Sequence, residues 1–154
     1  MRRRRRLPKP GFVGVDPGRS SGGIAYIADS CTMTWKLSDM TDADIWSVFE
    51  LLGEHAVFAV IERVNSMPGQ GVASSFKFGA SFGELKMATV AARIPFELVT
   101  PVKWQTAMKC RSKGDKNVTK GAAQRLFPKH KITHANADAL LLAEHARRLH
   151  TERH

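Results

Sequence analysis

The sequence is poor in cysteine and has no long hydrophobic run. Its 154 residues include two cysteines, Cys31 and Cys110, which lie far apart and show no metal-ligand spacing. Two isolated cysteines support neither a disulfide framework nor a zinc-ligand motif, and they favour free thiols in a reducing compartment. No segment approaches the ~20 apolar residues of a membrane span. We therefore expect a cytoplasmic protein without a membrane partner.

Acidic residues are also in the minority. The chain has 14 Asp and Glu residues against 24 Lys and Arg residues, which gives a formal net charge of +10 at pH 7. The run Arg2–Arg6 supplies only part of this excess, so the rest of the chain is basic as well. Such a charge balance favours an acidic partner, with nucleic acid as the first candidate and an anionic membrane surface as the second.

The length of the chain and the position of the arginine run predict one domain with a basic arm. A chain of 154 residues is typical of a single domain. We predict that residues 1–10 form a disordered arm, that residues 11–150 form the domain and that residues 151–154 form a tail. A signal peptide is not expected, because Leu7-Pro8-Lys9-Pro10 follows the arginines in place of an apolar core. The arm either adds salt-sensitive affinity for phosphates or is a solvated tail.

Apolar patterns and turn residues predict an α/β chain of five strands and five helices. Short connections join the first three strands, which indicates an antiparallel meander. Strands and helices then alternate, so we predict a mixed five-stranded sheet, three antiparallel strands and then parallel strands, with helices on both faces. The predicted strands are 12–16, 23–28, 31–37, 57–61 and 96–99, and the predicted helices are 42–53, 72–92, a short one that starts at 101, 118–126 and 135–150.

Three carboxylates lie where apolar side chains would be expected. Asp16 and Glu62 each follow a buried-looking strand, and Asp138 lies on the apolar face of the last predicted helix. The first and fourth strands of a mixed sheet can be neighbours, which would bring Asp16 and Glu62 together at the strand ends. Taken alone, Asp138 is equally well explained as an acid in the first helical turn, where the helix dipole favours it.

An acidic cluster of this kind has the ligand chemistry of a magnesium site. Converging buried carboxylates repel each other and need a cation. Hard oxygen ligands, without Cys and His residues at ligand spacing, favour Mg²⁺ or Mn²⁺ over zinc. Two such ions about 4 Å apart can activate a water and stabilise the leaving oxygen in phosphodiester hydrolysis. In a basic protein, the three acids therefore predict a metal site that faces a polyanion.

Short motifs surround the three acids in a fixed order along the chain. They are Gly14-Val15-Asp16-Pro17-Gly18 with Ser21-Gly22-Gly23-Ile24-Ala25, then Ile61-Glu62, then Pro101-Val102-Lys103-Trp104-Gln105 with Gly114-Asp115-Lys116, and finally Asp138-Ala139-Leu140. This ordered set resembles the motifs of RuvC-type Holliday junction resolvases, which have a ribonuclease H-like fold. The likeness extends from Phe12 to Arg148 and is greatest to the compact, phage-type members.

The resemblance implies a metal-dependent endonuclease that cleaves Holliday junctions or other branched DNA by two-metal-ion hydrolysis. It implies a homodimer with its two active sites on opposing strands, without a nucleotide cofactor, in the cytoplasm of a bacterium or a phage-infected host cell. Carried over by position, Asp16, Glu62 and Asp138 would be ligands of Mg²⁺, or of Mn²⁺, with two ions per active site. Lys116 would lie near the scissile phosphate.

Two positions depart from the family pattern. Family members usually carry a fourth ligand three residues before the last aspartate, where this chain has Ala135. His134 is our candidate substitute and Asn136 a poorer one; the alternative is that His134 is a helix-start residue without a metal. Some members also have an aromatic wedge three residues after the glutamate, where this chain has Asn65. The second departure bears on junction selectivity more than on hydrolysis.

Six cationic side chains cluster between the fifth predicted strand and the helix after it. Their density beside the expected site favours contact with phosphates, and the alternative is a solvated basic surface. In the same region Trp104 is interpreted as a core residue. On the long helix, Phe76, Phe78 and Phe82 are interpreted as packing residues that could stack on an opened base if exposed. The six cations are Lys103, Lys109, Arg111, Lys113, Lys116 and Lys120.

Other functions fit parts of the pattern. A related nuclease could debranch forks or flaps, and a non-cleaving junction-binding protein would keep the basic surface, although the intact set of three acids argues against the latter. The loop at residues 67–71 either inserts at a branch point or is a connector. Asp16-Pro17-Gly18 also loosely resembles the phosphate loop of actin-like and sugar kinases, but those enzymes need a second such domain, for which 154 residues leave no room.

Overall fold

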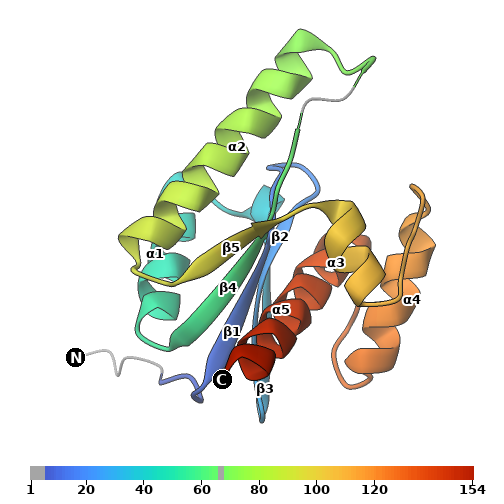
Figure 1. Cartoon of the computed structure of the whole chain (residues 1–154). Coiled ribbons are helices and arrows are strands. Elements are labelled where there is room, and N and C mark those ends of the chain that lie inside the picture. Colours follow the sequence, from blue (N-terminus) through green and yellow to red (C-terminus); the bar gives the residue numbers. More distant parts are fainter. Residues whose placement is uncertain (1–5, 66–67) are drawn as a thin grey trace.

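A mixed five-stranded sheet forms the centre of the protein (Figure 1). The computed structural model describes residues 6–65 and 68–154. The strands are β1 (Gly11–Asp16), β2 (Gly23–Ala28), β3 (Cys31–Lys36), β4 (Ala56–Glu62) and β5 (Phe96–Val99). They lie in the order β3-β2-β1-β4-β5, with β2 antiparallel to β1 and β3, and with β4 parallel to β1 and β5. The predicted mixed sheet is confirmed.

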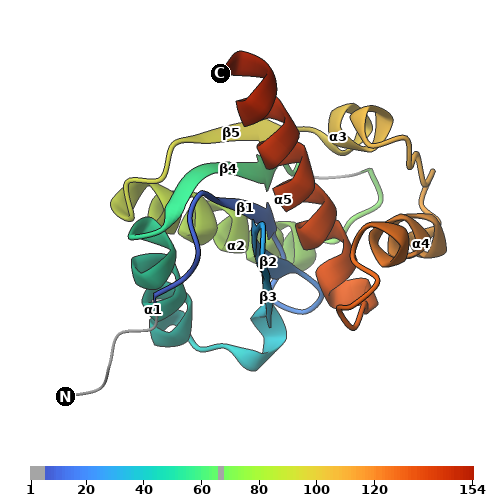
Figure 2. The ribbon, with the colours of Figure 1, turned by 90° about the horizontal axis from the view of Figure 1, so that it is seen from below.

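Helices cover both faces of this sheet, as the sequence predicts (Figure 2). One face carries α1 (Asp42–Gly53) and α2 (Val72–Ala91), and the other side carries α3 (Pro101–Ala107), α4 (Lys116–Leu126) and α5 (His134–Arg153). A short 3₁₀ helix, η1 (Leu37–Asp39), precedes α1. The helix starts follow from the sequence, because Thr41 and Thr133 form capping boxes and Thr100 caps the helix that begins with Pro101.

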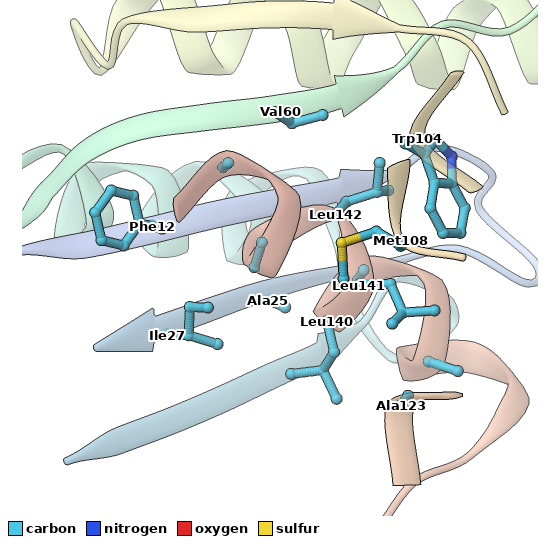
Figure 3. Packing of buried hydrophobic residues seen from close by; sticks show 14 of the residues in the cluster. Phe12, Ala25, Ile27, Val60, Trp104, Met108, Ala123, Leu140, Leu141 and Leu142 are labelled. Carbon is cyan, nitrogen blue, oxygen red and sulfur yellow. The ribbon is translucent and has the colours of Figure 1, made fainter. Parts of the chain in front are cut away.

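Each face of the sheet has its own apolar core. On the α5 face, Phe12 packs in one cluster with Trp104 and Leu142 (Figure 3). On the opposite face, Val13 and Val15 pack in a second cluster with residues of α1 and α2. Because successive residues of a strand point to opposite faces, β1 is buried on both sides along its length, and only its last residue is half-buried. That last residue is Asp16.

Two glycines let α5 lie directly on the sheet. A Cβ added at Gly14 would stand 2.0 Å from the carbonyl oxygen of Ala139 and 2.4 Å from the amide nitrogen of Ala143. A Cβ added at Gly23 would stand 2.6 Å from the carbonyl oxygen of Ala135. Only residues without a side chain permit this approach. The close contact brings the first turns of α5, and with them Asp138, to the carboxyl end of β1.

The structure shifts the bounds of several predicted elements. α4 begins at Lys116 rather than at residue 118, because the Asp115 side chain accepts a hydrogen bond from the Asn117 N–H at 2.9 Å. β3 ends at Lys36, one residue earlier than predicted, and Leu37 begins η1. α5 begins at His134 and continues to Arg153, so residues 151–153, predicted as a tail, are helical.

The amino-terminal segment is partly attached to the sheet. Leu7 is buried in the α1–α2 core, and the Tyr26 hydroxyl donates a hydrogen bond to the Pro8 carbonyl. Leu7 and Pro8 therefore contact the folded domain, although they were predicted as part of a disordered arm. The predicted arm residues 1–5 lie outside the described residues. A search of the described helices found none that is long and apolar enough to cross a membrane.

Candidate functional site

The topology brings the three predicted carboxylates to one cavity. In the parallel pair β1–β4, Val15 lies opposite Ile61, so Asp16 and Glu62 end neighbouring strands at the same edge. α5 crosses above them and contributes Asp138. The three side chains line a cavity of about 230 Å³. Its other lining residues are Pro17, Ser21, Phe78, Lys116, Thr119 and His134.

Burial raises the pKa of all three carboxyl groups, and repulsion between them adds to the rise for Asp16 and Glu62. Burial is the largest cause for Asp16, followed by the negative charges of Glu62 and Asp138, and it raises the Asp16 pKa well above its usual value. Burial and the charge of Asp138 raise the pKa of Glu62 to about 7. The pKa of Asp138 is also raised, mainly by burial. Charged carboxylates are therefore unfavourable here unless a cation compensates them.

Trp104 contacts the site as well as the core. Its indole Nε1–H donates a hydrogen bond of 2.7 Å to Glu62 Oε2, and this bond opposes the rise in the Glu62 pKa. The side chain is fully buried, so the predicted core position is correct, but its polar contact was not predicted. A buried indole N–H needs an acceptor. A predicted core tryptophan therefore needs a polar partner, and the predicted acid Glu62 at the end of β4 was a candidate for it.

Lys116 and Thr119 join the site from the first turn of α4. Lys116 lines the cavity, and its positive charge lowers the pKa of both Asp16 and Asp138. Thr119, which was not among the predicted site residues, is buried and hydrogen-bonds the carboxyl group of Asp138. The Asp115 cap determines where α4 begins and so places Lys116 at the cavity.

His134 lines the cavity, and Asn136 is engaged elsewhere. His134 is exposed at the first position of α5, and its charge lowers the pKa of Asp138. The Asn136 side chain accepts from the Thr133 N–H at 2.8 Å and donates to the Lys131 carbonyl at 2.9 Å. Of the two alternatives for a fourth ligand, His134 therefore has the better position.

The described residues contain no group of three His, Cys, Asp or Glu side chains arranged to hold a metal ion as they stand. Asp16, Glu62 and Asp138 share a cavity, but they do not form a finished coordination shell. Their oxygen donors are nevertheless of the type that hard divalent cations prefer. A cation would also relieve the repulsion that raises the pKa values of Asp16 and Glu62. The residues thus fit such an ion by chemistry and need side-chain adjustment to coordinate it.

Only one of the six predicted phosphate-contacting cations lines the carboxylate cavity, and this is Lys116. The ammonium of Lys103 lies 3.9 Å from Glu97 of β5, which also pairs with Arg153 at 2.8 Å. Lys120 is half-buried on α4. The remaining three, Lys109, Arg111 and Lys113, are exposed between α3 and α4. The structure therefore spreads this cluster over a surface beside the cavity.

Comparison with known proteins finds likeness in structure and not in sequence. No protein-family model matches the chain, and a search of curated proteins found no match. The structure resembles Thermus thermophilus RuvC with a TM-score of 0.63, at 18% sequence identity, over 86% of this chain and 90% of that one. It also resembles T. thermophilus RuvC in complex with a Holliday junction substrate, with a TM-score of 0.63, at 19% identity, over 86% and 89%. The chain therefore has the ribonuclease H-like fold of RuvC.

Proposed function

We propose that this protein is a metal-dependent, structure-selective endonuclease that hydrolyses phosphodiester bonds in Holliday junctions or other branched DNA. The observation that carries the proposal is the convergence of Asp16, Glu62 and Asp138 on one cavity with Lys116. Two further features support it. The fold resembles that of RuvC, which has been solved with a Holliday junction substrate, and the chain has a net charge of +10, which favours a polyanionic partner.

The proposed mechanism assigns a role to each side chain at the cavity. Asp16, Glu62 and Asp138 would hold Mg²⁺ or Mn²⁺, with His134 as a further ligand. Two bound ions would supply an activated water and stabilisation of the leaving oxygen. The Trp104 N–H orients one oxygen of Glu62, and Thr119 orients Asp138. Lys116 places a positive charge at the cavity, where it would attract the scissile phosphate and offset its developing negative charge.

We also propose that the active form is a homodimer joined through α2. Four large apolar side chains on the outer face of this helix are exposed: Val72 by 89%, Phe76 by 77%, Met87 by 61% and Val90 by 47%. Between them lie Gly79 and Gly83, where an added Cβ would meet nothing within 4 Å. A long apolar stripe favours an interface, and one with small residues at its centre can pack against its own copy about a two-fold axis.

A cleavage assay on matched DNAs tests the proposed function. The protein and Mg²⁺ are incubated with four-way, three-way, flap and linear substrates, and the cuts are mapped. Symmetric nicks across the four-way junction are expected, and cuts confined to flaps or forks would indicate a broader debranching nuclease. The Asp16→Asn variant is the control for contaminating nucleases and should bind but not cut. Binding by the wild type without any cutting would contradict the hydrolytic role.

A further inference from the structure

A second cavity adjoins the carboxylate site on the side away from α4. It has a volume of about 550 Å³ and lies among the β1–β2 loop, η1 and the first half of α2. Ser21 and Phe78 line both this cavity and the carboxylate cavity. The two hollows are therefore neighbours that share part of their walls, and a chain-like ligand at one would pass beside the other.

The lining of the second cavity has the chemistry of a phosphodiester-binding surface. Lys77 supplies positive charge, and four serines, at positions 20, 21, 38 and 74, supply hydroxyl groups. Arg19 adds a guanidinium whose charge is shared with Asp42. Leu37, Met40 and Phe78 add an apolar part that suits a sugar or a base. None of the described residues that line this cavity is an Asp or a Glu. Cations and hydroxyls are the side chains that contact nucleic-acid backbones without reading sequence.

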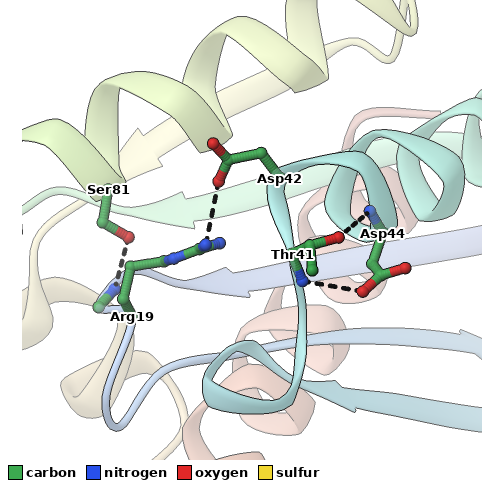
Figure 4. Close-up of polar contacts among 6 residues, drawn as sticks. Arg19, Thr41, Asp42, Asp44 and Ser81 are labelled. Atoms are coloured by element: carbon green, nitrogen blue, oxygen red, sulfur yellow. Dashed lines mark hydrogen bonds and ion pairs between the residues drawn. The ribbon is translucent and has the colours of Figure 1, made fainter.

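Hydrogen bonds hold the wall of this cavity in place. Figure 4 shows two of them: the Gly18 N–H donates to Ser81 Oγ of α2 at 3.2 Å, and Arg19 Nη2 donates to Asp42 Oδ1 of α1 at 2.9 Å. The Gly22 N–H closes the loop onto the Gly18 carbonyl at 2.8 Å. Arg19 Nη1 has no hydrogen-bond partner among the described residues. The guanidinium is thus held beside the cavity by its ion pair with Asp42, and its other terminal nitrogen is buried.

We infer that this second cavity binds the backbone of the cleaved DNA strand on one side of the cut, at phosphates next to the scissile one. The inference rests on the proposed nuclease function and gives the strand a path. A strand at the carboxylate site would have Lys116 on the α4 side and Arg19 with Lys77 on the α2 side. The cations predicted from the sequence to contact phosphates lie in the run Arg2–Arg6 and in the region from β5 to α4, so this surface adds a further contact region.

Lys77→Ala combined with neutralised phosphates tests the inference. Binding of a four-way junction is measured by fluorescence anisotropy in EDTA, with single methylphosphonates placed in turn at each position near the branch point. Lys77→Ala should weaken binding about fivefold and lower the salt slope by about 1. At one or two positions the methylphosphonate should weaken binding of the wild type but not that of Lys77→Ala. Lys86→Ala, an exposed lysine further along α2, is the matched control and should bind like the wild type.

The outcomes separate this inference from the proposed function. Equal affinities of Lys77→Ala and Lys86→Ala, or methylphosphonate effects that are the same in Lys77→Ala and the wild type at every position, would overturn the assignment of the cavity. If one methylphosphonate weakens binding of the wild type but not of Lys77→Ala, and the protein never cuts DNA, the assignment of the cavity is supported and the hydrolytic role is overturned. Failure of the wild type to bind branched DNA would overturn both.

Discussion

At the scale of single residues, the candidate site combines buried acids with only partial compensation. Glu62 receives one hydrogen bond from Trp104, and Asp138 has Thr119, Lys116 and His134 nearby. Burial nevertheless remains the largest influence on the pKa of each acid. The free protein therefore holds these groups in a state that favours uptake of protons or of a cation, and this state should be visible in its stability.

Glu62 should make the metal-free protein less stable as the pH rises. Its pKa is about 7 in the folded state against 4.5 for the free side chain. Between these values the folded state holds a proton that the unfolded state releases, so the contribution of Glu62 to the free energy of unfolding falls with rising pH, by up to about 3 kcal/mol. In urea unfolding with EDTA, the free energy of unfolding of Glu62→Gln should therefore rise relative to that of the wild type between pH 5 and pH 8.

The exposed Glu50→Gln on α1 removes the same charge and serves as the control. Its difference from the wild type should stay constant over that range. A constant difference for Glu62→Gln as well would show that the carboxyl group titrates normally. Addition of Mg²⁺ should reduce the pH effect in the wild type, because a bound cation favours the charged carboxylate.

Trp104→Phe tests whether the indole N–H positions Glu62. Phenylalanine keeps an aromatic ring in the core but removes the donor, so the pKa of Glu62 should rise further. The cleavage rate should fall by about tenfold, and the acidic limb of its pH profile should shift to higher pH. The free energy of unfolding should fall by about 1–3 kcal/mol. Carbon-13 NMR of the Glu62 carboxyl group measures the pKa directly. Trp46→Phe, on the surface of α1, is the matched control, and an unchanged Glu62 pKa in Trp104→Phe would reduce Trp104 to a packing residue.

At the scale of secondary structure elements, the site depends on how closely α5 approaches the sheet. Asp16 and Glu62 are brought together by the β1–β4 pairing alone, whereas Asp138 needs α5 to lie flat on β1. Gly14 is the residue that permits this contact. Its backbone neighbours belong to a helix and cannot move aside as a flexible side chain could.

Gly14→Ala should therefore disrupt the fold where an ordinary glycine replacement would not. The added Cβ would overlap backbone atoms of Ala139 and Ala143, which predicts a loss of more than about 3 kcal/mol or failure to fold. Gly121→Ala in α4 is the control, because only the far end of Arg125 lies near its Cβ, at 3.5 Å. That change should raise stability by up to about 1 kcal/mol. Circular dichroism during urea unfolding measures both, and a normally stable Gly14→Ala would mean that α5 sits further from β1.

The elements were largely predictable from the sequence, and the contacts between their side chains were not. Apolar runs and turn residues gave the strands, and the order of strands made β1 and β4 plausible neighbours, which placed Asp16 beside Glu62. The bond from Trp104 to Glu62 depends on how α3 packs, which no local pattern specifies. The same limit applies to the basic cluster, where Lys103 pairs with Glu97 while Lys116 faces the acids. Closeness in sequence does not determine the direction in which side chains point.

At the scale of the whole molecule, cleavage of both strands of a branch requires two active sites, and α2 offers a surface for pairing. This helix buries one face against the sheet and exposes an apolar stripe on the other. If two copies pair about an axis near Gly79 and Gly83, Phe76 and Met87 lie on either side of it. The backbones can approach closely there because both glycines face open space.

Phe76→Glu and Met87→Glu should each separate the proposed dimer without unfolding the protein. Each variant adds a charge on both sides of an apolar interface, so the dissociation constant should rise by about 100-fold or more. Sedimentation equilibrium at micromolar concentration should find a dimer for the wild type and a monomer for both variants, with unchanged far-ultraviolet circular dichroism. Lys129→Glu, exposed between α4 and α5, is the charge-changing control and should remain dimeric. A monomeric wild type that still nicks four-way junctions symmetrically would show that paired cutting does not need this surface.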